Sequence, residues 1–324
     1  MNQELTYTER AYTKLENLCY TRFKTMYTDD AVARQRMENE LLAIKKQGSS
    51  PMYIFVYDLL TEIQASSRQF CLRGVQGSSV VAYLLGLSEI NPISIYPRLY
   101  SEFVIRKNGR GLTSIEINVT KKMYAEIVNY LEHYIGEAKI RCQHTEKGKL
   151  VAVYVSAPQK MLSYYHNEEE FRFGFNKVSS QKKLGKNIIT GPVFDAANPK
   201  SFAEFVKCRG LSFGEDVNGV WEGNAEELFK SGKVELKELI AHREDVYEFL
   251  LSHNINHEEA YKIAEDVTWG RIRKNGWNAD DLALMYKAGI PEWFIKSCEK
   301  ILFLFSRAHS IMFLKHYAKL CNDS

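Results

Sequence analysis

Residues 291–314 read PEWFIKSCEKILFLFSRAHSIMFL, a proline followed by a long apolar run that contains Arg307 and His309. Pro291 favours the first turn of a helix, because the N–H that proline lacks has no helical partner there. The run over residues 301–314 is too short to cross a bilayer and carries a charge, so it predicts a core helix. This stretch therefore indicates a helical domain in the last part of the chain.

The residues around this stretch also follow helical patterns, from residue 201 onward. Glycine adopts the left-handed conformation of helix ends at little cost, so glycines predict where short helices stop. The glycines concerned are Gly210, Gly214, Gly219, Gly232, Gly270, Gly276 and Gly289. We therefore expect an all-α domain over residues 196–324.

Helix signals also occur near the start of the chain. Thr28 predicts the N-cap of a helix with Met37 and Leu41 on its buried face. Residues 52–60 are apolar throughout and fit a buried strand or a buried helix. Residues 80–87 predict a further buried helix.

Strands are predicted where apolar residues alternate with polar ones, over residues 112–119 and 150–155. Residues 159–200 are polar and irregular, with acidic and basic runs, and predict a loop-rich connection between two domains. We therefore expect an α/β domain over residues 1–195.

The composition is that of an ordinary folded protein. The chain has 324 residues, which suggests about two domains, and 45% hydrophobic with 26% charged residues fits a globular core. A net charge of +3 is too small to indicate nucleic-acid binding by itself. Residues 1–4 lack the basic and apolar regions of a signal peptide, so we expect a cytoplasmic protein with no membrane partner.

The six cysteines stand at positions 19, 71, 142, 208, 298 and 321. No two of them have the C-x-x-C spacing of a zinc knuckle or of a redox motif. We expect reduced, mostly buried thiols and no zinc site.

A glycine-serine element, RGVQGSS, covers residues 73–79 and precedes an apolar helix. Gly74 and Gly77 would let the backbone approach a ligand closely, and hydroxyls with free amides at a helix start can bind an anion. Arg73 would add a charged fork suited to phosphate. A tight turn into a helix explains the same residues, and both interpretations stay open on this pattern alone.

Several blocks between residues 201 and 309 resemble the fingers of the PolC-type DNA polymerase III alpha subunit. The blocks include Ser201-Phe202 with Glu204-Phe205-Val206, Gly210-Leu211-Ser212 with Trp221, Arg243-Glu244-Asp245, and Pro291-Glu292-Trp293-Phe294-Ile295 with Arg307-Ala308-His309. The segment 36–41, and Gly77-Ser78-Ser79 followed by Val81-Ala82, resemble the palm of the same family. The resemblance covers about residues 15–140 and 195–315.

This resemblance implies an α/β (α+β) palm of nucleotidyltransferase type, followed by all-α fingers. It implies that the nucleotide phosphates are bound by Arg73, Gly74, Gly77, Ser78, Ser79, Arg307 and His309. It further implies contacts to DNA or phosphate from Lys207, Arg209, Arg243 and Lys262. DNA, dNTPs and replisome proteins are the partners that follow from it, and other domains of the family have no counterpart in this sequence.

This sequence lacks the two catalytic aspartates that the family resemblance leads us to expect. The family places two aspartates at i and i+2 of one palm strand, a spacing that puts both on one face. The matching positions hold Ser114 and Glu116, followed by Asn118. One carboxylate would hold Mg²⁺ weakly, and no third carboxylate has a matching motif, since Glu168–Glu170 fits a solvated acidic loop.

Three functional hypotheses follow. The first is a catalytically degenerate PolC-like protein that still binds DNA or dNTP phosphates. The second is an active minimal DNA polymerase with rearranged metal ligands, in which Glu116 is the remaining catalytic carboxylate. The third is a non-catalytic protein that binds the replisome or acts as its decoy.

Overall fold

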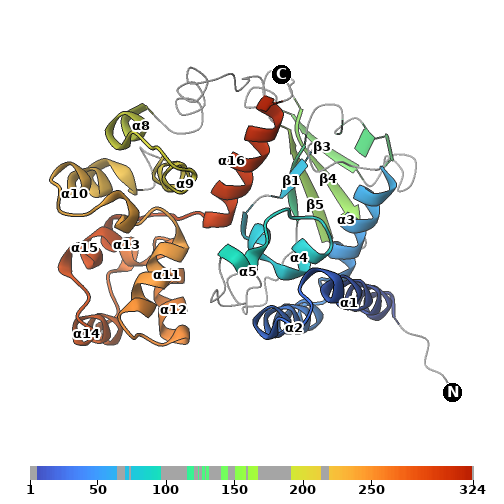
Figure 1. The fold of residues 1–324 in the computed structure, drawn as a ribbon, viewed down its shortest axis with the longest axis horizontal. Coiled ribbons are helices and arrows are strands. Elements are labelled where there is room, and N and C mark those ends of the chain that lie inside the picture. The colour runs from blue at the N-terminus through green and yellow to red at the C-terminus, as the bar shows by residue number, and fades with distance from the viewer. Residues whose placement is uncertain are drawn as a thin grey trace. The chain divides into compact units, whose positions relative to one another are not determined.

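The computed structural model describes residues 6–63, 70–72, 74–95, 115–119, 123, 126–127, 129–130, 140–144, 150–157, 160–166, 191–212 and 219–322. These residues are mostly helical (Figure 1). The chain divides into two compact units, one of residues 1–172 with 315–320 and one of residues 173–314 with 321–324. The expected domain boundary at residue 195 stays a prediction.

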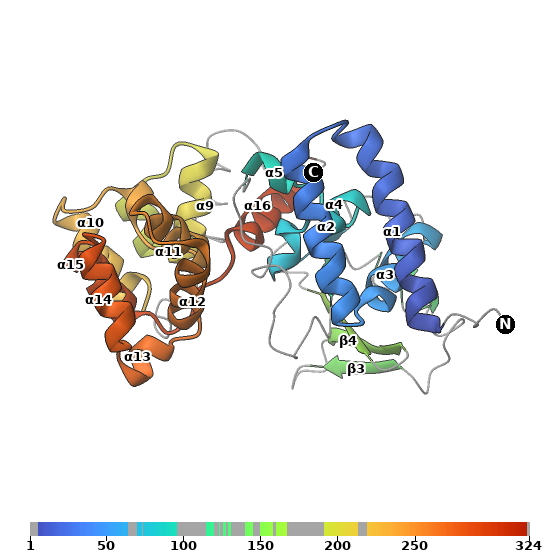
Figure 2. The same ribbon diagram turned by 90° about the horizontal axis from the view of Figure 1, so that it is seen from below.

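The first unit begins with three long helices, α1 (Tyr7–Met26), α2 (Ala31–Lys46) and α3 (Ser50–Glu62). Helix α1 packs against α2 and α3 (Figure 2). The two short helices α4 (Val80–Leu84) and α5 (Pro92–Ile95) follow. The core between these helices holds fully or almost fully buried side chains, among them Leu15, Phe23, Met37, Leu41, Ile44, Tyr53 and Val56.

Local sequence explains most of these helices, with two exceptions. The predicted cap Thr28 is wrong, because Asp30 is the N-cap of α2 and its side chain accepts a hydrogen bond from the Ala33 amide. Thr28 instead lies in the turn before it, with a φ of 51°. Residues 52–60, which fitted a strand or a helix, lie in α3, where Pro at the first turn favours the helix.

A five-stranded sheet completes the first unit, in the order β1-β2-β5-β4-β3. The strands are β1 (Phe70–Leu72), β2 (Glu116–Val119), β3 (Ile140–His144), β4 (Leu150–Ala157) and β5 (Lys160–His166). Strands β2 and β5 are parallel, and the other pairs are antiparallel. The predicted loop over residues 159–200 is wrong at β5, which continues the β4 hairpin and lies next to β2. It is also wrong over Gly191–Ala197, which form a helix.

The described residues of the second unit form helices and connecting turns, with no strand. Its helices are α8 (Gly191–Ala197), α9 (Phe202–Leu211), α10 (Glu226–Lys230), α11 (Arg243–Ser252), α12 (His257–Thr268), α13 (Arg271–Asn275), α14 (Ala279–Lys287), α15 (Glu292–Lys300) and α16 (Arg307–Asn322), of which α16 extends into the residues of the first unit. Its core holds Trp221, Tyr247 and Phe294, each almost completely buried.

Two helix boundaries differ from the sequence prediction. The core helix expected over residues 301–314 begins only at Arg307, and residues 301–306 before it are not helical, with Ile301 at a ψ of 128°. Pro291 is the N-cap of α15 and directly precedes its first turn. Within the described residues, no helix is both long enough and apolar enough to cross a membrane.

The glycines mark helix ends as predicted at positions 232, 270, 276 and 289, where φ is positive. Gly219 also has a positive φ but precedes the helical turn Trp221–Ala225. Gly210 is different, because it lies inside α9. A Cβ atom at Gly210 would come within 2.4 Å of His242 Nε2 and 2.7 Å of the Ala241 carbonyl oxygen. Glycine is therefore required at this position by close packing. Gly214 lies outside the described residues.

Candidate functional site

The glycine-serine element forms a 3₁₀ turn over Gly74–Ser78, followed by α4. Ser79 is the N-cap of α4, and its Oγ accepts a hydrogen bond from the Ala82 amide at 3.0 Å. Gly74 has a φ of 68° and Gly77 is buried. The tight turn into a helix is thus present, and Arg73 lies outside the described residues.

A glutamate from α2 already binds the amides at the start of α4. Glu40 Oε2 accepts hydrogen bonds from Ser79 Oγ at 2.7 Å and from the Val81 amide at 3.1 Å. Its other oxygen, Oε1, accepts from the Val80 amide at 3.2 Å. The Glu40 side chain is completely buried. A carboxylate of the protein therefore sits where the sequence suggested that a ligand phosphate would bind.

Arg36 completes this network from the preceding turn of α2. Its Nε lies 3.4 Å from Glu40 Oε1, and its Nη2 donates to the Ser78 carbonyl oxygen. Sequence reasoning included both residues in the family resemblance but assigned neither to a site. The available signal was an Arg–Glu pair at i and i+4 on the face that also holds Met37, because buried charges require partners.

Strand β2, in the segment expected to hold the carboxylate pair of the family, begins at Glu116, which is paired with Ser163 of β5. Ser114 lies outside the described residues. Glu116 is the only aspartate or glutamate in the five described strands. No three His, Cys, Asp or Glu side chains gather as metal ligands within the described residues. Mg²⁺ is held by hard anionic oxygens, and whether this chain binds it stays a prediction.

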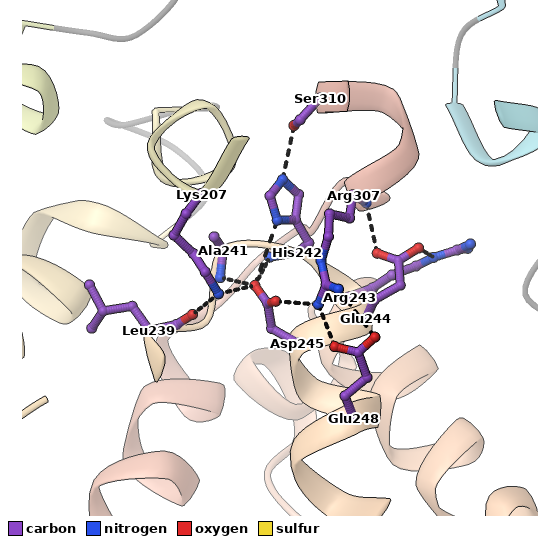
Figure 3. A network of polar contacts seen from close by, with 10 residues as sticks. All are labelled: Lys207, Leu239, Ala241, His242, Arg243, Glu244, Asp245, Glu248, Arg307 and Ser310. Atoms are coloured by element: carbon purple, nitrogen blue, oxygen red, sulfur yellow. Dashed lines mark hydrogen bonds and ion pairs between the residues drawn. The ribbon is translucent and has the colours of Figure 1, made fainter. Parts of the chain in front are cut away.

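In the second unit, two of the predicted cations, Lys207 and Arg307, meet around one buried carboxylate, that of Asp245 on α11 (Figure 3). Asp245 accepts hydrogen bonds from the backbone amides of Ala241 and His242, at 2.9 and 2.8 Å. Lys207 Nζ lies 3.0 Å from the same oxygen, and Arg307 Nη2 donates to the other at 2.6 Å. Burial raises the pKa of Asp245, but the two cations outweigh it and hold that pKa well below its usual value.

Arg307, at the start of α16, binds a second carboxylate. Its Nη1 and Nη2 donate to the two oxygens of Glu248 at 3.1 and 2.6 Å, as a bidentate fork. Its backbone amide donates to Glu244 Oε2 at 2.7 Å. Burial lowers the pKa of Arg307, but Asp245 and Glu248 outweigh this effect and raise it. Arg307 thus holds the start of α16 against α11.

His242 connects the same cluster to α16. Its Nε2 lies 2.9 Å from Ser310 Oγ, and its Nδ1 lies 3.6 Å from Asp245 Oδ2. The side chains of His242 and Ser310 are completely buried. This Ser–His–Asp arrangement cannot act as a hydrolytic triad, because no substrate could reach the serine hydroxyl. Burial lowers the pKa of His242.

Two other predicted phosphate ligands pack against aromatic rings. The Arg209 guanidinium lies over the Phe313 ring, 4.5 Å from its centroid. His309 stacks on Phe305 with ring centroids 5.2 Å apart and is 4% exposed. Both contacts stabilise the attachment of α16 to its own unit.

The last two predicted cations also have carboxylate neighbours. Arg243 Nε donates to Glu244 Oε1 at 3.1 Å in the buried part of the cluster. Lys262 Nζ lies 2.8 Å from Asp281 Oδ1, with 55% of the lysine side chain exposed. The structure therefore brings Lys207, Arg243 and Arg307 into one network. Phosphate binding by these side chains stays a prediction.

The first part of the chain is similar to known proteins. Residues 13–150 match the family model described as the bacterial DNA polymerase III alpha NTPase domain. PolC-type DNA polymerase III of Ureaplasma parvum is 37% identical over 134 residues, which are 41% of this chain and 9% of that protein. The Caldanaerobacter subterraneus enzyme is 37% identical over 116 residues, 36% of this chain and 8% of the relative.

The PolC-type enzyme of Clostridium perfringens is 36% identical over 132 residues, 41% of this chain and 9% of the relative. The alignments with these three curated relatives span less than a tenth of each relative's length. Over the matched part of its length, this chain is similar to the bacterial DNA polymerase III alpha NTPase domain and to PolC-type DNA polymerase III enzymes.

Proposed function

We propose that this protein is a catalytically degenerate PolC-like protein that binds phosphate groups of DNA or dNTPs and does not carry out efficient nucleotidyl transfer. The proposal rests on the number of acidic residues in the strands of the sheet. Its five described strands contain one carboxylate residue, Glu116. A polymerase-type transfer uses two metal ions that neutralise charge on the reacting phosphates, and carboxylates hold those ions.

Electrostatic stabilisation of the reacting phosphates is usually the largest catalytic contribution, so a missing carboxylate has a large effect on rate. Ser114 offers a neutral hydroxyl at the position of the first family aspartate. Glu116 is one methylene longer than the aspartate it replaces, which moves its oxygens. Binding does not depend on these groups to the same degree, because lysine and arginine side chains supply most of the attraction to phosphate.

In this proposal, a nucleotide phosphate contacts the glycine-serine turn rather than the start of α4. Glu40 occupies the Val80 and Val81 amides. Within the first unit, a bound phosphate would therefore contact the glycine-serine turn before them, Gly74–Ser78. Within the second unit, Arg307 is the most suitable side chain for a phosphate, since a guanidinium fork matches two phosphate oxygens.

The experiment that tests the proposal is a primer-extension assay on one primer-template with all four dNTPs, in Mg²⁺ and in Mn²⁺. Binding of the same primer-template is followed by fluorescence anisotropy at several salt concentrations. We expect binding that weakens with salt and little or no extension. Extension that is abolished in Glu116→Gln would refute degeneracy and favour an active minimal polymerase.

A second variant tests the role of the missing carboxylates directly. Ser114→Asp combined with Glu116→Asp restores the family pair without supplying a third carboxylate. We expect at most a small gain in extension. A large gain would mean that the rest of the metal site is intact. Protein that binds no DNA, yet recovers replisome subunits in a pulldown, would favour an interaction or decoy role.

A further inference from the structure

Glu248 and Arg307 form a contact with the geometry that a phosphate group would adopt. The two terminal nitrogens of Arg307 donate to the two oxygens of Glu248, at 3.1 and 2.6 Å (Figure 3). Carboxylate and phosphate oxygens accept the same parallel pair of N–H bonds from arginine. A carboxylate of the chain therefore occupies the fork that the predicted ligand would use.

The two carboxylates that bind Arg307 are not equally accessible. The Asp245 side chain is 8% exposed and is also bonded to two backbone amides. The Glu248 side chain is 48% exposed, and its partner Arg307 is 20% exposed. Burial raises the pKa of Glu248 and outweighs the nearby charge of Arg307, which lowers it. A ligand from solvent could therefore replace Glu248 and could not replace Asp245.

The charges around Arg307 cancel. Lys207, Arg243 and Arg307 are positive, and their carboxylate partners are Glu244, Asp245 and Glu248. His242, completely buried and with its pKa lowered by burial, adds no charge at neutral pH. A neutral cluster attracts an anion weakly, whereas removal of the Glu248 charge leaves one excess positive charge beside solvent.

We propose that Glu248 is an internal competitor for phosphate at Arg307, so that a phosphate group binds there by displacing the Glu248 carboxylate. The inference rests on the proposed function, in which Arg307 contacts phosphate. The ligand chemistry is a phosphate oxyanion, either of a nucleotide triphosphate or of the DNA backbone. Asp245 remains bound to Arg307 in both states and keeps the guanidinium in position.

The test is the affinity of Glu248→Gln for inorganic tripolyphosphate and for primer-template DNA, each measured against the wild-type chain. Glutamine keeps the shape of the side chain and removes its charge. We expect roughly fivefold tighter binding, the order expected when one partly exposed ion-pair partner is removed. A gain with tripolyphosphate assigns the site to nucleotide phosphates, and a gain with DNA alone assigns it to the backbone.

Glu226→Gln is the matched control, because it removes the same charge from a surface pair in the same unit. Glu226 Oε1 lies 2.6 Å from Lys230 Nζ, and neither residue belongs to the cluster. We expect its affinity to stay within error of the wild type. Equal gains in phosphate affinity in the two variants would mean that only net charge matters, and would overturn the proposal. A gain in affinity that persists when Arg307→Lys is added to Glu248→Gln would also overturn it.

Modification by phenylglyoxal, which reacts with arginine, separates failure of this proposal from failure of the proposed function. Peptide mass spectrometry gives the rate at Arg307 without any ligand. Faster modification of Arg307 in Glu248→Gln, with no phosphate binding by either protein, would show that Glu248 shields the fork while the proposed function fails. Phosphate binding by the wild type, with no change in affinity or modification rate in Glu248→Gln, would overturn the competitor role alone.

Discussion

Replacement of Glu40 by glutamine removes the one charged oxygen pair that holds α2 to the start of α4. The carboxylate accepts from Ser79 Oγ and from the Val80 and Val81 amides, and it lies 3.4 Å from Arg36 Nε. Glutamine keeps one acceptor oxygen and places an NH₂ group at the other position. In either orientation, that NH₂ group faces a backbone N–H, so a buried donor loses its acceptor.

The expected cost can be worked from these contacts. A buried donor that loses its acceptor costs about 1–3 kcal/mol. Removal of one member of a buried ion pair costs about 3–5 kcal/mol, and this figure already includes part of the first. We therefore expect Glu40→Gln to destabilise the first unit by about 3–5 kcal/mol. The same change at Glu38, a half-buried residue bonded to the Tyr20 hydroxyl, should cost less than about 1 kcal/mol.

The assay needs a reporter that belongs to the first unit. All four tryptophans, at positions 221, 269, 277 and 293, lie in the second unit. Cys19 is completely buried in α1, and Cys298 is completely buried in α15. Pulsed alkylation over a urea series, read by peptide mass spectrometry, therefore follows the two units separately. Cys19 should become reactive at a lower urea concentration in Glu40→Gln.

The Glu40 reasoning fails if the Cys19 curve of Glu40→Gln coincides with that of Glu38→Gln. A double variant adds a further check, because Arg36→Met removes the charge that Glu40 compensates. The double variant Arg36→Met with Glu40→Gln should cost less than the sum of its single changes. Additive costs would show that the two side chains do not interact.

Four further outcomes are expected. Gly210→Ala should destabilise the second unit by about 3 kcal/mol, seen as an earlier tryptophan-fluorescence transition in urea, because its Cβ would lie 2.4 Å from His242 Nε2; an unchanged midpoint would contradict the packing argument. Burial lowers the pKa of His242 below 6.5, so the unfolded chain takes up the proton at a higher pH than the folded chain does. Stability should therefore fall as the pH drops below 6.5, and His242→Asn should make stability depend less on pH in this range. Asp245, whose pKa is held below 3.8 despite burial, should add a further loss below that pH, absent in Asp245→Asn. Burial raises the pKa of Cys19 and of Cys208 to about 12, so both should resist a thiol reagent at pH 8 until urea unfolds the chain; rapid labelling of the native protein would refute their burial.

Local patterns predicted the elements that depend on neighbouring residues. Residues 150–155 form most of β4, and residues 80–84 form α4, as their apolar patterns indicated. The family resemblance came from short blocks of contiguous residues, and the match over residues 13–150 confirms it for the first part of the chain. For the blocks between residues 201 and 309 the resemblance stays a prediction. The identity of the two parts as palm and fingers stays a prediction.

Sequence patterns predicted the wrong secondary structure where the conformation depends on contacts with residues far away in the sequence. Residues 301–306 are apolar enough for a helix, yet the chain is not helical there because its backbone bonds elsewhere. The Leu304 amide donates to the Thr268 carbonyl oxygen, and the Phe305 carbonyl oxygen accepts from the Arg243 amide. Strand β5 lies in a segment that is polar and irregular as a whole, and its neighbours in the sheet decide its conformation.

The sequence by itself determined the helices, the helix-ending glycines and the relation to a polymerase family, since these depend on periodicity, backbone conformation and short blocks of residues. The tertiary structure decided what the charged residues bind. Glu40 reaches Ser79 across 39 residues, and Arg307 reaches Asp245 across 62. Sequence spacing could suggest phosphate ligands because it shows which side chains are basic. It could not show that carboxylates from other helices already bind them, because those contacts exist only once the helices have packed.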